Sequence, residues 1–215
     1  MTSSSLSLPA DWCNAHVPRR LAAPGVTSAV LYKAVDSLEP KWLTMYDTEA
    51  PVANISESYA ALEALGSDKE KAILSNIRGL SRRTYEHMRT FTHSNTTAAS
   101  LPAKYILAVG FIMTPDGEDE LDKWYNEEHM DLLSKVPGWK QGRRFKLVEY
   151  NQRGDSMAGK PVHKYLAFHS FDNQQFAGTP EFKHATGTEW RGRVMEKCLD
   201  REARVFEVYR NFGKQ

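Results

Sequence analysis

Apolar residues recur at helical spacing between Leu121 and Val136. On a helical wheel they form one broad apolar side, with Glu128 and His129 at its flanks. The Pro-Gly pair at 137–138 ends this pattern, and a basic, alternating run from Trp139 predicts a strand. We therefore predict an amphipathic helix that places a histidine where the helix meets a sheet or a cavity. The apolar side consists of Leu121, Trp124, Tyr125, Leu132, Leu133 and Val136.

A second copy of this pattern occurs near the N-terminus. The segment Trp12-Cys-Asn-Ala-His16 leads to the Pro-Gly pair at 24–25, and the histidine-to-proline distance is the same as in the later copy. Each Pro-Gly pair precedes a strand that carries an aromatic residue followed by a lysine, Tyr32-Lys33 in the first copy and Phe145-Lys146 in the second. We infer that the chain is an internal duplication.

The remaining pattern predicts similar elements in both halves. Pro18 is expected to bend or interrupt the first helix, whereas Ser67 and Glu70 form a capping-box pair that starts another. In the first half we predict a helix from Pro9, strands over 25–35, 41–46 and 84–91, and helical pieces over 55–65 and 67–77. In the second half we predict strands over 104–113, 139–150, 163–171 and 203–212, and helices over 121–136 and 179–199, the latter broken near Gly187.

These elements predict an α+β fold of two tandem ferredoxin-like repeats, residues 1–97 and 98–215, joined by a polar linker over 92–103. The first repeat lacks its opening strand. Because the helices of such a unit cover one sheet face, the other apolar face must be buried against a second sheet. We expect an intrachain α+β barrel, in which two facing sheets enclose a central cavity and one sheet is a strand short.

Composition and charge exclude several classes of function. The chain has 215 residues and a net charge of +1, which argues against a nucleic-acid binder that works by neutralising phosphates. No stretch reaches the ~18 apolar residues of a membrane span, and no signal-peptide pattern is present, so we expect a cytoplasmic protein without a membrane partner.

Cysteine usage and the sheet edge add two expectations. Cys13 and Cys198 each lie on a predicted helix without a nearby Cys or a paired His, so neither a disulfide nor a zinc site is indicated. Adjacent helical residues such as Glu128 and His129 cannot converge on one metal ion, and we predict no metal site and no cofactor.

The missing strand leaves a sheet edge that the N-terminal tail or a second chain could cover, so a homodimer is one expectation.

His129 is the first candidate for acid/base catalysis, because a neutral imidazole with a pKa near about 6.5 can take up and return a proton. Glu128 or a nearby tyrosine could orient it, although adjacent residues on a helix point about 100° apart. The alternative interpretation is a histidine at the helix edge that bonds to backbone, with Glu128 as a solvated charge. His87 is a further catalytic candidate, because it lies on a strand face that could border the cavity.

Aromatic and apolar side chains are expected to line the cavity, which suits a flat apolar or aromatic small molecule. Arg89 and Arg210 occupy equivalent positions in the two repeats, where they suit a scaffold role as well as contact with a substrate. The candidate substrate-binding side chains are His16, Trp124, Tyr125, His169, Arg89 and Arg210.

The motif Trp-Tyr-Asn-Glu-Glu-His129 with Pro137-Gly138 downstream, and its echo at His16 and Pro24-Gly25, resembles the dimeric α+β barrel superfamily. Within it, the chain is similar to the EthD-like proteins, particularly the duplicated ones of filamentous fungi. The resemblance implies a helix histidine that lines the barrel cavity. It also implies a range of activities, since the superfamily includes polyketide cyclases, decarboxylases, isomerases, cofactor-free quinone-forming monooxygenases and some haem enzymes.

The leading hypothesis is a cofactor-independent cyclase, dehydratase, decarboxylase or isomerase that uses histidine acid/base catalysis on a small hydrophobic, polyketide-derived metabolite. A second hypothesis is a cofactor-free or haem-assisted oxidase or monooxygenase of phenolic substrates. A third is a small-molecule-binding or stress protein without catalytic activity.

Overall fold

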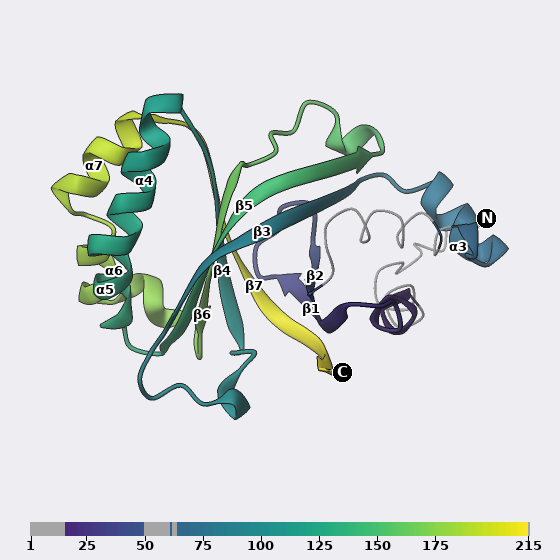
Figure 1. Ribbon diagram of the computed structural model, residues 1–215, viewed down its shortest axis with the longest axis horizontal. Helices are drawn as coiled ribbons and strands as arrows, with labels where there is room; N and C mark the ends of the chain where they lie inside the picture. The colour runs from purple at the N-terminus through teal and green to yellow at the C-terminus, as the bar shows by residue number, and fades with distance from the viewer. Residues whose placement is uncertain (1–15, 50–60, 62–63, 215) are drawn as a thin grey trace.

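Seven antiparallel strands form one continuous, curled sheet in the computed structural model, which describes residues 16–49, 61 and 64–214 (Figure 1). Each strand that the sequence predicts is present, and several are longer than predicted. The strands are β1 (Val26–Ala34), β2 (Trp42–Thr48), β3 (Leu80–Thr92), β4 (Tyr105–Met113), β5 (Trp139–Arg153), β6 (Tyr165–Phe171) and β7 (Cys198–Lys214).

The strand order β2-β1-β7-β4-β6-β5-β3 explains how the two repeats are joined. In the second repeat β4 lies between β6 and β7. Its counterpart in the first repeat would lie between β2 and β3, and these two strands are the edges of the sheet. Because β1 pairs with β7 and β3 pairs with β5, the repeats share two seams. The predicted α+β barrel of tandem ferredoxin-like units, one strand short, is thus confirmed, with its two halves fused into one sheet.

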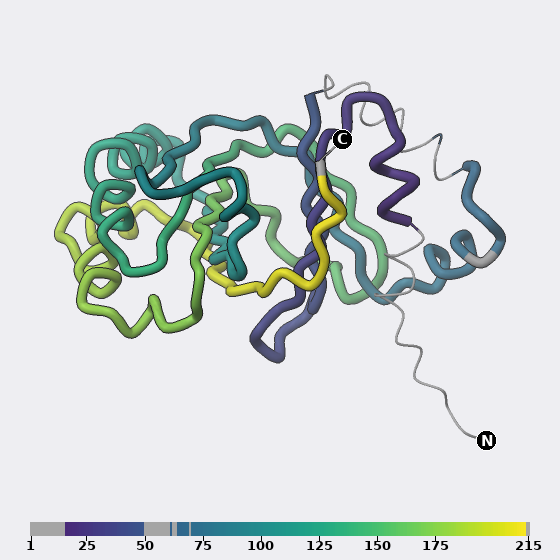
Figure 2. The backbone as a smooth tube through the Cα atoms, turned by 90° about the horizontal axis from the view of Figure 1, so that it is seen from below, coloured from purple at the N-terminus to yellow at the C-terminus, as the bar shows by residue number. Residues whose placement is uncertain are grey.

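Two groups of helices lie at opposite ends of the molecule (Figures 1 and 2). A helix over 16–21 and α3 (Asp68–Ser75) belong to the first repeat. The predicted capping box of α3 is confirmed, since Ser67 and Glu70 each bond to the other's backbone. The second repeat contributes α4 (Glu118–Trp124), α5 (Met130–Ser134), α6 (Pro180–Ala185) and α7 (Glu189–Glu196), which cover one face of its strands.

The two faces of the sheet bury separate apolar cores. Along β4, Leu107, Val109 and Phe111 pack under the helices, whereas Ile106 points to the inside of the curl. The region where a central cavity between facing sheets was expected holds the large side chains of this inner core. The buried members of this inner core are Val30, Tyr32, Ala34, Ile106, Phe145, Phe168 and Phe206.

Two local predictions need correction. Cys198 begins β7 rather than ending a helix, because β7 pairs with β4 as far as Met113, which lies opposite Cys198. The helix predicted over 121–136 begins at Glu118 and is interrupted by a π-helical turn, Tyr125–His129. The predicted helix from Pro9, Cys13 and most of the helix over 55–65 lie outside the described residues. Within the described residues, no helix is both long and apolar enough to cross a membrane.

Candidate functional site

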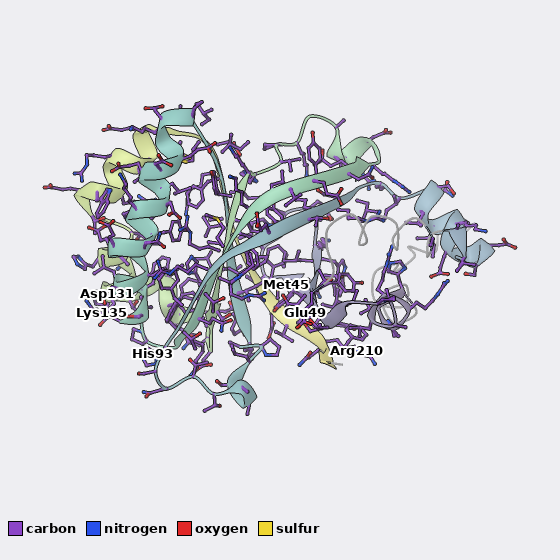
Figure 3. All side chains as sticks on the ribbon, viewed as in Figure 1. Met45, Glu49, His93, Asp131, Lys135 and Arg210 are labelled. Atoms are coloured by element: carbon purple, nitrogen blue, oxygen red, sulfur yellow. The ribbon has the colours of Figure 1, made fainter. Side chains whose placement is uncertain are left out.

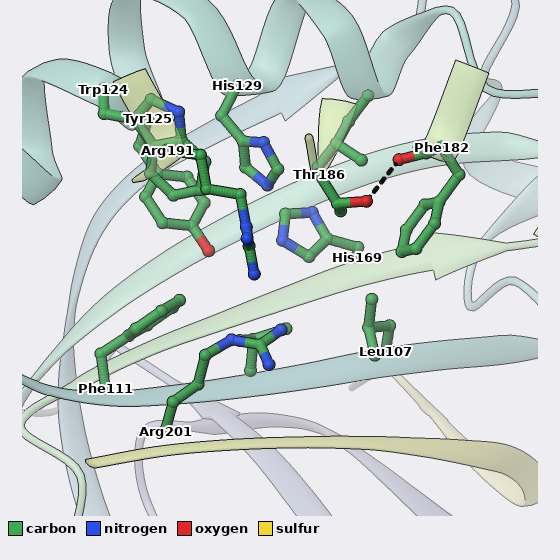
Figure 4. Close-up of a pocket in the computed structure, with 12 residues that line it drawn as sticks. Leu107, Phe111, Trp124, Tyr125, His129, His169, Phe182, Thr186, Arg191 and Arg201 are labelled. Atoms are coloured by element: carbon green, nitrogen blue, oxygen red, sulfur yellow. Dashed lines mark hydrogen bonds between the residues drawn. The ribbon is translucent and has the colours of Figure 1, made fainter. Parts of the chain in front are cut away.

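A pocket lies between the helices of the second repeat and strands β4, β6 and β7 (Figure 4). Its inner chamber has a volume of about 30 Å³. A cavity needs about 10–15 Å³ of space of this kind to hold one water molecule, so the chamber alone suits very small molecules. The chamber is lined by Leu107, Val109, Phe111, Trp124, Tyr125, His129, Leu133, His169, Phe182, Thr186, Arg191 and Arg201.

The π-helical turn Tyr125–His129 forms one wall of the chamber. The backbone N–H of Met130 bonds to the carbonyl of Tyr125, five residues back, which is the π-helical pattern. This wider turn places His129 one turn from Trp124, and the two rings stack with centroids 4.0 Å apart. Tyr125 meets His129 edge to face at 5.1 Å. π-Helical turns inside α-helices are often found at functional sites.

His129 is buried and held in one tautomer. Its Nδ1 lies 3.1 Å from the carbonyl oxygen of Ala185 on α6. Because a carbonyl only accepts hydrogen bonds, Nδ1 must carry the proton, and Nε2 keeps its lone pair. Burial lowers the pKa of His129 well below its usual value, and neighbouring His169 lowers it further. The resting side chain is therefore a neutral imidazole with a basic nitrogen.

His169 on β6 is the second histidine of the chamber, 6.1 Å from His129 between ring centroids. It is 1% exposed, and neither ring nitrogen has a hydrogen-bond partner. Burial, followed by the charge of Arg144, lowers its pKa to about 3. Since buried polar groups in native proteins are almost always bonded, two unpartnered nitrogens on a side chain that lines a chamber indicate a place for a ligand.

Tyr125 supplies a neutral hydroxyl group to the same chamber. Its ring is parallel to that of His169 at 6.2 Å, and burial raises its pKa to about 12. Behind it, the guanidinium of Arg144 lies 4.3 Å from the ring centre and bonds to Asp122 at 2.6 Å. The cation lies over the tyrosine ring and helps to fix its orientation.

Glu128 does not orient His129 directly. Its carboxylate accepts hydrogen bonds from the indole of Trp124 at 2.9 Å and from the hydroxyl of Thr188 at 2.7 Å. Thr188 is the N-cap residue of α7. Glu128 therefore connects the ring that stacks on His129 to the start of another helix of the pocket.

A wider groove of about 350 Å³ continues from the chamber, with Leu107, Phe182, Thr186, Arg191 and Arg201 lining both spaces. This volume lies within the range of small-molecule sites (~300–1,000 Å³). Arg191 on α7 and Arg201 on β7 were not among the predicted site residues. From the sequence, the last strand was predicted to begin at residue 203. Because it begins earlier, the alternation that places Arg201, Ala203 and Val205 on one face was missed.

The structure brings together four of the predicted site residues, Trp124, Tyr125, His129 and His169, with Glu128 bonded to one of them. The others lie elsewhere. His87 is exposed on the edge strand β3 and bonds to Thr90 at 2.8 Å.

The remaining predicted residues lie outside this pocket as well. Arg89 lies over Phe91, and Arg210 lies over Phe212 near the end of β7 (Figure 3). His16 belongs to the first repeat's helix, where its Nδ1 is 3.7 Å from Glu70 and burial lowers its pKa to about 4.

Among the residues that the structure describes, no group of three or more His, Cys, Asp or Glu side chains is placed to hold a metal ion. The two histidines of the chamber face aromatic and arginine side chains instead of carboxylates.

The sequence matches no protein-family model and no curated protein sequence. The fold is similar to that of solved structures. An anthrone oxidase-like protein superposes with a TM-score of 0.65 at 16% identity, over 94% of this chain and 87% of that one. A candidate monooxygenase from Fusobacterium nucleatum gives a TM-score of 0.54 at 9% identity, over 95% of this chain and 85% of that one. At these identities the likeness shows a shared α+β barrel fold.

Proposed function

We propose that this chain is a cofactor-independent monooxygenase or oxidase of an aromatic substrate with an acidic C–H or O–H group. The observation that carries the proposal is that the chamber is lined by two neutral histidines 6.1 Å apart between ring centroids, His129 with a basic nitrogen and His169 with two buried, unpartnered nitrogens. The names of the two solved structures, an anthrone oxidase-like protein and a candidate monooxygenase, support oxygen chemistry on this fold.

The first step is proton transfer. A carbon flanked by aromatic rings or a carbonyl group gives its proton to Nε2 of His129 and becomes a carbanion. Burial disfavours an isolated imidazolium, but the carbanion formed beside it supplies the opposite charge. The protonated histidine is thus stabilised only when the substrate anion is present.

The second step is oxidation by dioxygen. The carbanion gives two electrons to O₂ and forms a carbon–oxygen bond, and the peroxide takes the proton from His129. Loss of water then leaves a ketone. The balance is R₂CH₂ + O₂ → R₂C=O + H₂O, so one oxygen atom enters the substrate and the other leaves as water.

The volumes of the groove and the chamber suit the two reactants, an aromatic substrate and O₂. The groove of about 350 Å³ can take an aromatic ring system, and the chamber of about 30 Å³ suits a molecule as small as O₂ or water. The haem-assisted variant of this function would be recognised by a Soret band of the purified protein.

The cyclase, dehydratase, decarboxylase and isomerase hypothesis uses the same histidine as base. Nothing in the geometry opposes it, and oxygen consumption separates it from the proposed function. Membership of the EthD-like proteins is likewise proposed on the motif around His129 alone.

Oxygen uptake with anthrone and with hydroxylated anthrones tests the proposal, with products identified by mass spectrometry. We expect uptake that needs no added flavin, metal or haem, persists with a chelator, and gives the corresponding anthraquinone. His129→Gln should abolish turnover, and His184→Gln, at an exposed position on α6, should not. Conversion of these substrates without oxygen uptake would favour a lyase or isomerase. Unchanged turnover by His129→Gln would remove the base assignment.

A further inference from the structure

Two arginines enter the pocket from opposite walls (Figure 4). Arg191 comes from α7, on the helical side, and Arg201 comes from β7, on the sheet side. Both line the inner chamber and the wider groove, so they stand at the junction of the two spaces. The two side chains are close enough that the charge of Arg201, after burial, lowers the pKa of Arg191.

The charge of this pair is not balanced within the part of the chain that the structure describes. Neither arginine forms a salt bridge or a side-chain hydrogen bond there, and no Asp or Glu lines the chamber or the groove. Two buried arginines of the second repeat are each paired with a carboxylate, Arg144 with Asp122 at 2.6 Å and Arg204 with Asp36 at 2.8 Å. Arg191 is partly buried and Arg201 is exposed, so the repulsion between the two like charges acts mainly on Arg191, and an anion bound between them would relieve it.

The walls around the pair restrict the kind of anion. Leu107, Phe111 and Phe182 are apolar, and the outer groove adds Phe176, Ala203 and Val205. Such walls suit a flat ring system and oppose a strongly hydrated ion such as free phosphate. The two histidines remain neutral at physiological pH and add no charge of their own.

We infer that Arg191 and Arg201 together bind a negatively charged oxygen of an aromatic substrate, either a carboxylate or an ionised phenol or enol, while its ring lies in the groove. This inference rests on the proposed function in taking the pocket as the substrate site. Planar guanidinium groups pair well with carboxylate and phenolate oxygens. The oxyanion at the junction would direct the adjacent acidic carbon toward His129.

Binding measured without oxygen tests the inference apart from turnover. The probes are naphthoate, its neutral analogue naphthalenemethanol, and para-nitrophenol, whose phenolate form is seen by absorbance. We expect naphthoate to bind the full-length protein at least roughly tenfold more tightly than naphthalenemethanol, as for a charge-assisted hydrogen bond. Tight binding of para-nitrophenolate with weak naphthoate binding would assign the site to ionised phenols, and the reverse would assign it to carboxylates.

Variants at the pair and a matched control complete the experiment. Arg191→Gln and Arg201→Gln should each weaken anion binding roughly tenfold and leave naphthalenemethanol binding unchanged. Arg193→Gln, at an exposed position on the same helix as Arg191, should change neither. Arg201→Lys keeps the charge and should retain part of the affinity, which separates a charge effect from misfolding.

Three results would overturn the inference. These are equal affinity for the charged and neutral probes, unchanged anion binding by both glutamine variants, and weaker binding of the neutral probe to the same extent. His129→Gln should keep the anion affinity. Anion binding that depends on both arginines in a protein that consumes no oxygen would support the inference and defeat the oxygenase proposal.

Discussion

Trp124 and His129 stack with ring centroids 4.0 Å apart and planes 24° from parallel, although they are five positions apart on one helical segment. In a regular α-helix, at about 100° per residue, these side chains would diverge by about 140°. The π-helical turn Tyr125–His129 brings them to one face. The orientation of the His129 ring, and therefore of its basic nitrogen, depends on the position of Trp124. The hydrogen bond from its indole to Glu128 fixes that position.

Glu128 holds Trp124, so its removal should loosen the site and destabilise the fold. Glu128→Ala removes the acceptor for the Trp124 indole and for the Thr188 hydroxyl. We expect the free energy of unfolding, measured by urea denaturation, to fall by about 1.5–3 kcal/mol. Glu127→Ala in the same turn is the control, because Glu127 is exposed and should have little effect. Equal effects of the two substitutions would contradict the role given to Glu128.

His169 should lower the stability of the protein, because a buried nitrogen without a hydrogen-bond partner is unfavourable. Replacing it by leucine removes two buried, unpartnered nitrogens. We expect His169→Leu to raise the free energy of unfolding near pH 7 by about 1–3 kcal/mol and to abolish turnover. Chemical denaturation and an oxygen-uptake assay on the same preparation would check both. A destabilised His169→Leu protein would mean that the nitrogens have partners in solution.

The same histidine should make stability pH-dependent. In the unfolded state, His169 binds a proton below about pH 6.5. In the folded state, its pKa of about 3 keeps it unprotonated until the pH approaches 3. The unfolded state therefore binds more protons in this window, and stability falls as the pH falls. The loss from this residue should be about 1.4 kcal/mol per pH unit, and His129 adds a loss of the same sign. His169→Leu should show a shallower slope between pH 6.5 and 4.5 than the wild type.

The pH profile of kcat/KM should have its acid limb below pH 6.5. The limb reports the pKa of the base in the free enzyme, and burial lowers the pKa of His129 well below the usual value. Tyr125 should not contribute a limb in the neutral range, because its pKa is raised to about 12. Steady-state rates between pH 5 and 9, with a substrate that does not titrate there, would test this. An acid limb at or above pH 6.5 would assign the base to another group.

Periodicity and internal repetition predicted much of the fold. The helix with His129, the seven strands and the missing strand follow from sequence, and the structure adds matching details in the two repeats. Gly25 and Gly138, the second residues of the Pro-Gly pairs, both have positive φ, 81° and 84°, where glycine is unstrained. Arg89 lies 4.8 Å from the ring of Phe91, and Arg210 lies 4.7 Å from that of Phe212.

The position of the site was harder to predict, for identifiable reasons. β4 is apolar on both faces, so its pattern does not say which face is covered by helices and which lies inside the curl. The π-helical turn has no sequence signature of its own, since hydrogen bonds five residues apart do not depend on particular side chains. Arg191 and Arg201 line the same pocket only once the chain has folded, and no local spacing in the sequence records this.

The two repeats are also joined by ion pairs, and the pair Asp36–Arg204 allows a clear test. Arg204 on β7 is 5% exposed, and its guanidinium makes two bonds to Asp36, at 3.0 and 2.8 Å, and one to the carbonyl of Leu38 at 2.9 Å. Asp36→Ala leaves the buried cation without its carboxylate. We expect the free energy of unfolding to fall by about 2–4 kcal/mol, somewhat less than for a fully buried pair, because Asp36 is partly exposed.

The double variant separates the pair from its surroundings. Replacing the cation as well, in Asp36→Ala/Arg204→Met, removes the unpaired charge and places an apolar chain of similar length beside Phe206, over which the guanidinium now lies at 5.0 Å. We therefore expect the double variant to be more stable than Asp36→Ala alone, by at least about 1 kcal/mol. Asp119→Ala, at an exposed position, is the control. If the second substitution adds a further loss, Arg204 joins the repeats mainly through Leu38 and its own packing, and the ion pair is secondary.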